Sequence, residues 1–297
     1  MALNIAAPHT WPAAILPTLV ALCAAAANGH EISIVMSIVL LVIVVLMQSA
    51  VNTFNDYYDC IKGTDNADAD VEESDAVLIY NNVNPNSSLK LAIGFLVVAF
   101  ALGIYVIVRC GIIPLIIALI GALFVVIYSA GKTPISYLPI GEFVSGFVMG
   151  GLIVLASYQA LSGSFDWMAL VWAIPTIIGV GLIMFTNNTC DIERDIPAGR
   201  HTLPVVLGRE KARGVYHACV YVTVISILVI VAVFFTQGLL ICVFMLLAAF
   251  PVLKALLANP LDSTHRVQAM SQILSVNIVL GAFYAAAILG SLIPLGI

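Results

Sequence analysis

Stretches of about 20 apolar residues recur along the whole chain, and they limit its possible folds more than any other feature. One of them, ISIVMSIVLLVIVVLMQSAV at 32–51, contains no charged residue. Of the 297 residues, 62% are hydrophobic and only 9% are charged, and the mean hydropathy is +1.11. Such a composition is far too apolar for a soluble domain. The sequence therefore predicts an all-α, polytopic membrane protein, because a chain in lipid must satisfy its own backbone hydrogen bonds.

The apolar runs divide into nine predicted membrane spans when they are cut at glycine, proline, asparagine and charged residues. A helix rises about 1.5 Å per residue, so about 20 residues cross a hydrocarbon core about 30 Å thick. The predicted spans cover residues 11–28, 32–54, 89–109, 111–128, 142–162, 166–188, 214–235, 238–257 and 269–295. The leader MALNIAAPHT has no Lys or Arg, so we expect a permanent first span rather than a cleaved signal peptide. We expect one integral-membrane domain over residues 1–297.

The basic residues predict how the spans are oriented. Ten of the eleven Lys and Arg residues fall between even-numbered and odd-numbered spans, and only Arg109 falls on the other side. Cytoplasmic loops carry an excess of Lys and Arg. We therefore expect a multi-pass protein of the cell membrane, with its N-terminus and the loops after spans 2, 4, 6 and 8 in the cytoplasm and its C-terminus outside. The sequence has no basic cluster of the kind that binds nucleic acid.

Two polar clusters end spans 2 and 6, on the same predicted side of the membrane. Residues three or four apart share one face of a helix. The residues at this spacing are Asn52, Asn55, Asp56 and Asp59 in VNTFNDYYDCIKGTD (51–65), and Asn187, Asn188, Asp191 and Asp195 in FTNNTCDIERD (185–195). Because four spans separate the clusters, we expect a bundle of two duplicated four-helix halves. One such cluster is common on a solvated helix end, but two in equivalent places favour a functional site.

The chemistry of the clusters points to a hard cation and an anionic partner. Carboxylates on one face repel each other unless a cation lies between them. Ligand sets made of Asp and Asn oxygens suit Mg²⁺, whereas a zinc site would need His or Cys at close spacing. Basic residues accompany the acids, namely Lys62, Lys132, Arg194 and Arg200. Carboxylates with Mg²⁺ and a few cationic side chains are what binding a diphosphate requires.

These motifs resemble those of the UbiA family of intramembrane prenyltransferases, which has an NDxxDxxxD motif after its second helix and a DxxxD motif after its sixth. NDYYD (55–59) matches the first motif, and Asp191 with Asp195 matches the second. Within the family, the chain is most similar to the 1,4-dihydroxy-2-naphthoate prenyltransferases of menaquinone synthesis. The similarity extends over NDYYDCIKGTD, YSAGKTPISYLPIGE (128–142) and NNTCDIERDIPAGRHTLPVVLGREKA (187–212). In those relatives the third carboxylate of the first motif comes two places late, as Asp65 does here after Gly63.

The resemblance implies a nine-helix UbiA-like bundle that transfers a polyprenyl group from its diphosphate onto 1,4-dihydroxy-2-naphthoate. The reaction would release CO₂ and diphosphate and give demethylmenaquinol. It implies two Mg²⁺ ions held by Asn55, Asp56, Asp59, Asp65, Asn187, Asp191 and Asp195, of which Asp56, Asp59, Asp191 and Asp195 are catalytic. Lys62, Lys132, Arg194 and Arg200 would bind the diphosphate. The residues expected near the acceptor or the allylic carbocation are Tyr58, Tyr128, Tyr137 and Glu142.

Three alternatives stay open on the sequence alone. A different aromatic acceptor, such as 4-hydroxybenzoate, would use the same motifs. An ion-coupled transporter would also pair carboxylates, although such sites usually lie near the bilayer midplane rather than at span ends. A CDP-alcohol phosphotransferase would need one DGxxAR-type run, which is absent from the sequence. Residues 66–88 carry five acids and no Lys or Arg, whereas many UbiA relatives have a basic turn there.

Overall fold

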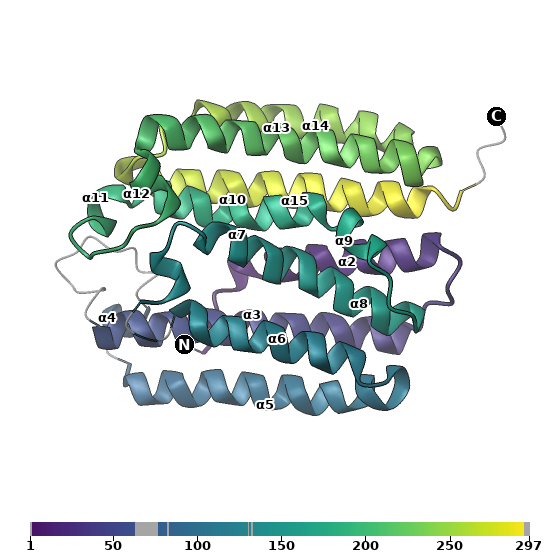
Figure 1. The fold of residues 1–297 in the computed structure, drawn as a ribbon, viewed down its shortest axis with the longest axis horizontal. Coiled ribbons are helices and arrows are strands. Elements are labelled where there is room, and N and C mark those ends of the chain that lie inside the picture. The colour runs from purple at the N-terminus through teal and green to yellow at the C-terminus, as the bar shows by residue number, and fades with distance from the viewer. Residues whose placement is uncertain (1, 63–76, 82, 130, 132, 294–297) are drawn as a thin grey trace.

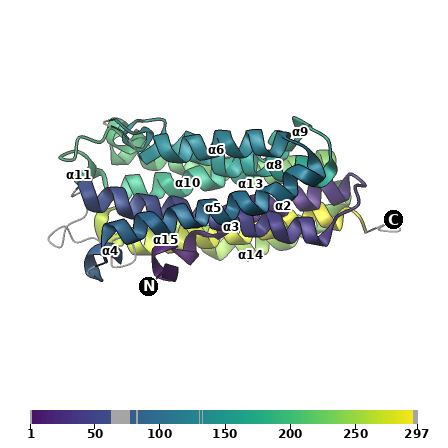
Figure 2. The ribbon, with the colours of Figure 1, turned by 90° about the horizontal axis from the view of Figure 1, so that it is seen from below.

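The computed structural model describes residues 2–62, 77–81, 83–129, 131 and 133–293. Within these ranges the regular structure is helical, and the long helices run side by side in one elongated bundle (Figures 1 and 2). The prediction of an all-α polytopic protein is confirmed.

Each predicted span has a helical counterpart among the described residues. These counterparts are α2 (Pro12–Ala27), α3 (Ile34–Lys62), α5 (Pro85–Cys110), α6 (Ile113–Ser129), α7 (Gly141–Ser145) with η3 (Gly146–Leu152) and α8 (Ile153–Ser162), α9 (Met168–Trp172) with α10 (Ile174–Cys190), α13 (Arg209–Phe234), α14 (Leu239–Ala258) and α15 (Arg266–Gly290). The short elements between them are α1 (Ala2–Ile5), η1 (Pro8–Thr10), α4 (Val77–Tyr80), η2 (Ile135–Tyr137), α11 (Ile192–Asp195), α12 (Leu203–Leu207), η4 (Thr236–Gly238) and η5 (Ser263–His265).

Length and composition divide the helices into two groups. In the described part of the chain, six helical segments are long and apolar enough to cross a membrane. The N-terminal pair Ala2–Thr10 and Pro12–Ala27, bent by 54°, would make a seventh. Ile113–Ser129 and Ile174–Cys190 are apolar but shorter, at 17 residues each. At about 1.5 Å per residue, each of these would rise about 25 Å.

The helix that carries the second acidic cluster packs unusually closely against its neighbour. A Cβ added at Gly146 would lie 2.3 Å from the carbonyl oxygen of Ile177, and one at Gly150 would lie 2.4 Å from that of Thr176. Only glycine allows η3 and α10 to approach this closely. The Thr176 hydroxyl also donates a 2.8 Å hydrogen bond to the Gly150 carbonyl. The π-helical segment η3 thus fixes α10, whose far end carries the second cluster.

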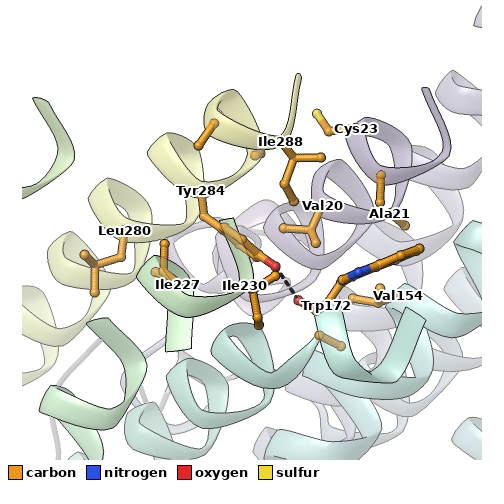
Figure 3. Packing of buried hydrophobic residues seen from close by; sticks show 14 of the residues in the cluster. Val20, Ala21, Cys23, Val154, Trp172, Ile227, Ile230, Leu280, Tyr284 and Ile288 are labelled. Carbon is orange, nitrogen blue, oxygen red and sulfur yellow. Dashed lines mark hydrogen bonds between the residues drawn. The ribbon is translucent and has the colours of Figure 1, made fainter. Parts of the chain in front are cut away.

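A buried core runs through the bundle, and Figure 3 shows its part around Tyr284. The Tyr284 hydroxyl of α15 donates a 2.9 Å hydrogen bond to the carbonyl of Trp172 at the end of α9. Apolar side chains of α2, α8 and α13 surround this pair, among them Val20, Val154 and Ile227. A buried tyrosine needs such a partner for its hydroxyl.

The last turns of α3, α6, α10 and α14 all lie at one end of the bundle, on the left in Figure 1. The connections after α2, α5, α8 and α13 lie at the other end, as does the last turn of α15. Both polar clusters therefore lie at the same end of the molecule. This arrangement agrees with the alternation expected from the sequence.

Candidate active site

A cavity of about 760 Å³ lies at the polar end of the bundle, and side chains of both clusters line it. From α3 it receives Asn52, Asn55 and Asp56. From α10, α11 and the residue between them it receives Asn187, Asp191 and Asp195. Two segments that are more than 120 residues apart in the sequence thus share one chamber.

The first cluster belongs to α3 itself, because the helix continues through it to Lys62. Asn52 anchors the N-terminal segment. Its amide donates to the carbonyl of Ala6 at 3.0 Å and to the Thr10 hydroxyl at 2.8 Å, and its Oδ1 accepts from Gln48 at 3.2 Å. The Asn55 Oδ1 accepts a hydrogen bond from the Ser129 hydroxyl. Asn52 therefore positions the chain around the cavity, while Asn55 and Asp56 line it.

The second cluster keeps helical spacing across a break in the helix. α10 ends at Cys190 and α11 starts at Ile192. Even so, the amide of Asp191 donates to the Asn187 carbonyl at 3.1 Å, and the amide of Asp195 donates to the Asp191 carbonyl at 2.8 Å. The three polar side chains therefore stay on the cavity face.

Asn188 does not share that face, so its predicted place in the polar stripe is wrong. Its side chain is 2% exposed and its Nδ2 donates to Glu142 Oε1 at 2.8 Å, on the side of α7. The cavity lining includes Asn187 but not Asn188, whose side-chain amide is hydrogen-bonded to Glu142 instead. Asn188 instead links α10 to the start of α7.

Two arginines expected to bind diphosphate line the cavity and contact the acids. Arg200 Nη1 lies 3.2 Å from Asp195 Oδ1, and its guanidinium lies over the Tyr137 ring, 5.2 Å from the centroid. Arg194 Nη1 lies 3.4 Å from Asp191 Oδ1. The Thr202 hydroxyl donates to Asp195 Oδ2 at 3.2 Å. Both cations are therefore already beside the carboxylates they were expected to accompany.

Arg266, at the start of α15, is a cavity residue that the sequence analysis did not single out. Its Nε lies 3.2 Å from each carboxylate oxygen of Asp191, and its Nη2 donates to Asn187 Oδ1 at 2.6 Å. In the sequence it is only one of the basic residues after span 8. The sequence did indicate one relevant feature of Arg266, because it falls on the same predicted side of the membrane as the acidic motifs.

The acids of the second cluster differ in their electrostatic surroundings. Burial raises the pKa of Asp195 to about 6, Arg200 opposes that rise, and the neighbouring charge of Asp191 adds to it. Asp195 is 2% exposed, so little water reaches its carboxylate. A carboxylate with a raised pKa gains from any further positive charge placed beside it.

Several expected site residues lie elsewhere or outside the described structure. Of the four residues expected near the acceptor, Tyr137 lines the cavity, whereas Tyr58, Tyr128 and Glu142 do not. Tyr58 packs its ring against Tyr57 at 5.3 Å, and Glu142 is 5% exposed behind Asn188. The side chains of Asp59 and Lys62, and the whole of Asp65 and Lys132, lie outside the described residues.

The oxygen atoms that line the cavity fit a hard divalent cation. They comprise carboxylates of Asp56, Asp191 and Asp195 and amide oxygens of Asn55 and Asn187. Mg²⁺ usually takes one or two protein carboxylates and completes its shell with water and substrate phosphates. Among the described side chains, no three His, Cys, Asp or Glu residues are close enough to hold a metal by themselves. The donor set therefore fits a cation that a phosphate group helps to bind.

An apolar groove adjoins the polar cavity. It has a volume of about 130 Å³ and lies between α3, α5, α6 and the η3–α8 segment. Gln48 and Met149 line both spaces, so the polar chamber and the groove are direct neighbours. The groove walls include Leu40, Phe100 and Ile117. Together the two spaces suit a molecule with an anionic head and an apolar tail.

This combination defines an all-α membrane protein with a cavity of acidic and basic side chains at one end of its bundle. The chain belongs to the UbiA prenyltransferase family, whose family model matches residues 14–277. The resemblance seen in the motifs is confirmed, and the transporter and CDP-alcohol phosphotransferase alternatives are set aside.

Individual relatives agree with this assignment. The chain is 31% identical over 205 residues to 1,4-dihydroxy-2-naphthoate octaprenyltransferase of Bacillus subtilis (strain 168), a match that covers 69% of this chain and 65% of that protein. It is 25% identical over 291 residues to UbiA prenyltransferase domain-containing protein 1 of Xenopus tropicalis, covering 95% of this chain and 79% of that one.

Solved structures show the same fold. The apo structure of a UbiA homolog from Aeropyrum pernix K1 matches with a TM-score of 0.70 at 18% identity, covering 91% of this chain and 96% of that one. A UbiA homolog from Archaeoglobus fulgidus, bound to DMAPP and Mg²⁺, matches with a TM-score of 0.62 at 17% identity, covering 97% and 98%. The expected UbiA-like fold is confirmed.

Proposed function

We propose that this protein transfers a polyprenyl group from polyprenyl diphosphate onto 1,4-dihydroxy-2-naphthoate, releasing CO₂ and diphosphate and giving demethylmenaquinol. One observation carries the proposal: both acidic motifs line a single cavity that lies directly beside an apolar groove. The choice of acceptor is supported by the similarity to the Bacillus protein and by the late position of Asp65 in the first motif.

In this proposal the diphosphate head occupies the polar cavity. Asp56, Asp59 and Asp65 on one side, and Asp191 and Asp195 on the other, would hold two Mg²⁺ ions, with Asn55 and Asn187 as neutral oxygen ligands. Mg²⁺ bound there would neutralise the charge that develops on the leaving diphosphate. Cationic side chains would contact the phosphate oxygens directly, as guanidinium groups do in paired hydrogen bonds. The residues in this role are Lys62, Lys132, Arg194 and Arg200.

The isoprenoid tail would lie in the apolar groove between α3, α5, α6 and α8. Apolar burial favours this placement by roughly 25 cal/mol per Å² of surface removed from water. With the head in the cavity and the tail in the groove, Gln48 and Met149 would flank the boundary between them. The allylic C–O bond would then lie near that boundary.

The bond-breaking step leaves an allylic carbocation, as the electron pair of the C–O bond departs with diphosphate. Tyr137 is the aromatic residue best placed to shield this cation, since its ring faces the cavity beneath Arg200. The electron-rich ring carbon of the acceptor that bears the carboxylate would then attack the cation. Loss of CO₂ from the ionised acceptor carboxylate would restore the aromatic ring. Tyr58, Tyr128 and Glu142 do not line the cavity, so in this proposal they would not contact the cation directly.

The same proposal fixes how the molecule sits in the membrane. We infer nine crossings, with α6 and the α9–α10 pair included, arranged as two four-helix halves and a final helix. The acidic end would face the cytoplasm, because the basic residues concentrate there. The prenyl diphosphate and the acceptor would both reach the cavity from that side.

The acceptor assignment is tested with the purified full-length protein in detergent, polyprenyl diphosphate, Mg²⁺ and a panel of aromatic acceptors, with products identified by mass. We expect a prenylated naphthalenediol that has lost CO₂. A product formed only with 4-hydroxybenzoate would preserve the family chemistry and overturn the naphthoate assignment. If no acceptor were prenylated, the proposed function would be wrong.

A further inference from the structure

Arg266 contacts side-chain oxygen atoms of Asp191 and Asn187, the same atoms that are proposed to bind the metal ion. It is the first residue of α15, and its side chain is 12% exposed. Its Nε lies 3.2 Å from both carboxylate oxygens of Asp191, and its Nη2 donates to Asn187 Oδ1 at 2.6 Å. One guanidinium therefore bridges a charged and a neutral ligand of the second acidic motif.

The position of Arg266 is unfavourable for the helix that carries it. The N-terminus of a helix bears a partial positive charge, which disfavours a cation in its first turn. The Asp262 carboxylate, which accepts a hydrogen bond from the His265 amide at 3.0 Å, offsets part of this effect just before α15. The contacts that Arg266 makes with Asp191 and Asn187 lie across the cavity from α15.

The loop before Arg266 is held firmly in place. Leu261 has a φ of 56°, in the left-handed region, and it is fully buried. Its amide donates to Asn259 Oδ1 at 2.9 Å, and its carbonyl accepts from Arg209 Nε at 3.0 Å. Arg209 also donates to the Thr189 carbonyl at 3.1 Å, next to the second motif. This bracing fixes the distance between the start of α15 and the end of α10.

A guanidinium and a divalent cation cannot share these ligands without repulsion. Like charges a few ångströms apart repel strongly where water is scarce. We propose that Arg266 is a resident counter-cation: it holds Asn187 and Asp191 in the ion-free protein, yields them to the divalent cation, and then donates to the diphosphate. This inference rests on the proposed function, because it needs the cation and the diphosphate to meet in this cavity.

This role couples the binding of the two ligands. Without diphosphate, Arg266 competes with the divalent cation and weakens its binding. With diphosphate present, the displaced guanidinium gains phosphate oxygens that it can bind in a paired geometry. Diphosphate should therefore strengthen cation binding more in the native protein than in a variant without this arginine. An arginine that only stabilised the fold would produce no such coupling.

The test measures Mn²⁺, as a probe for Mg²⁺, on the full-length protein in detergent by electron paramagnetic resonance of the free ion. Without diphosphate, we expect Arg266→Gln to bind Mn²⁺ about tenfold more tightly than the native protein, since a charge-assisted competitor is lost. Arg266→Lys should fall between the two, because an ammonium cannot bridge both ligands as a planar fork does. Adding inorganic pyrophosphate should tighten Mn²⁺ binding more in the native protein than in Arg266→Gln.

Arg109→Gln is the matched control, since it removes one exposed positive charge at the opposite end of the bundle. It should leave Mn²⁺ affinity unchanged. Equal or weaker Mn²⁺ binding by Arg266→Gln would overturn the proposal. If Arg266→Gln does not fold, the test uses Arg266→Lys alone. A Mn²⁺ affinity of Arg266→Lys that is no higher than that of the native protein would then overturn the proposal.

A parallel prenyl-transfer assay separates this inference from the proposed function. Native protein that prenylates no acceptor would contradict the proposed function, while the Mn²⁺ comparison would still be informative. Native protein that transfers prenyl groups, with unchanged Mn²⁺ affinity in Arg266→Gln, would overturn the counter-cation role alone.

Discussion

Asp191 and Asp195 lie one helical turn apart, yet their surroundings differ. Asp191 contacts Arg194 and Arg266, whereas Asp195 is paired with Arg200 and accepts a hydrogen bond from Thr202. Burial nevertheless raises the pKa of Asp195 to about 6. Its ionised form is therefore only partly compensated until a cation arrives.

The raised pKa of Asp195 predicts that metal binding depends on pH. Below the raised pKa, Asp195 is protonated, and a cation must displace that proton to bind. We expect Mn²⁺ affinity to fall as the pH drops below about 6, approaching a tenfold loss per pH unit for one displaced proton. Isothermal titration calorimetry between pH 7.5 and about 5 would measure this. Asp195→Asn should bind more weakly throughout and show a shallower slope, and a native affinity that is constant across this range would contradict the prediction.

Local spacing predicted the acidic residues well, but it could not reveal their partners. Asp191 and Asp195 share a face because helix geometry fixes neighbours four residues apart. Arg266 is 75 residues from Asp191 in the sequence, so only the tertiary fold shows their contact. The same local rule failed for Asn188, because its side chain is hydrogen-bonded to Glu142 of α7, a partner 46 residues away in the sequence.

At the scale of elements, apolar sequence predicts where the membrane helices lie, but it does not predict the residues at which they end. Apolar runs matched helices because lipid forces each run to close its own hydrogen bonds. The predicted second span stopped at residue 54, whereas α3 continues to Lys62. Polarity ends a membrane span but does not break backbone hydrogen bonding, and so α3 carries its acidic cluster beyond the apolar stretch. The close η3–α10 contact depends on Gly146 and Gly150 meeting a distant helix, which spacing alone does not show.

Two glycines line the apolar groove, and we expect them to set how long a prenyl chain the protein accepts. Gly103 of α5 and Gly121 of α6 line the groove, and an added Cβ at either would meet no atom within 4 Å. A leucine there should narrow the groove. We expect Gly103→Leu and Gly121→Leu to lower kcat/KM for long prenyl diphosphates about tenfold relative to short ones, the cost of overfilling a packed apolar space.

Gly94→Leu is the control for this experiment. Gly94 lies on α5, as Gly103 does, and an added Cβ there would also meet no atom within 4 Å. Gly94 does not line the groove. Competition between prenyl diphosphates of different length would report the ratio directly. Unchanged chain-length preference in both groove variants, or an equal shift in Gly94→Leu, would show that the tail lies elsewhere.

At the scale of the whole molecule, the distribution of basic residues predicts that the acidic end of the bundle faces the cytoplasm. Ser263 lies beside the acidic end, and Ser164 lies in the connection at the other end; both are exposed. In a background without native cysteines, Ser164→Cys should react with a membrane-impermeant maleimide added outside intact cells, and Ser263→Cys should react only after lysis. The opposite pattern would reverse the proposed orientation.

The central claim is that both acidic motifs act on one diphosphate through a divalent cation. The most direct test is the Mg²⁺-dependent rate of prenyl transfer in Asp56→Asn and Asp191→Asn, with membrane insertion verified for each. Each variant should lose at least about a hundredfold in rate, since each removes a charge that stabilises the leaving group. Asp166→Asn, an exposed carboxylate at the opposite end, should retain the native rate. A native rate in either Asp56→Asn or Asp191→Asn would contradict the claim.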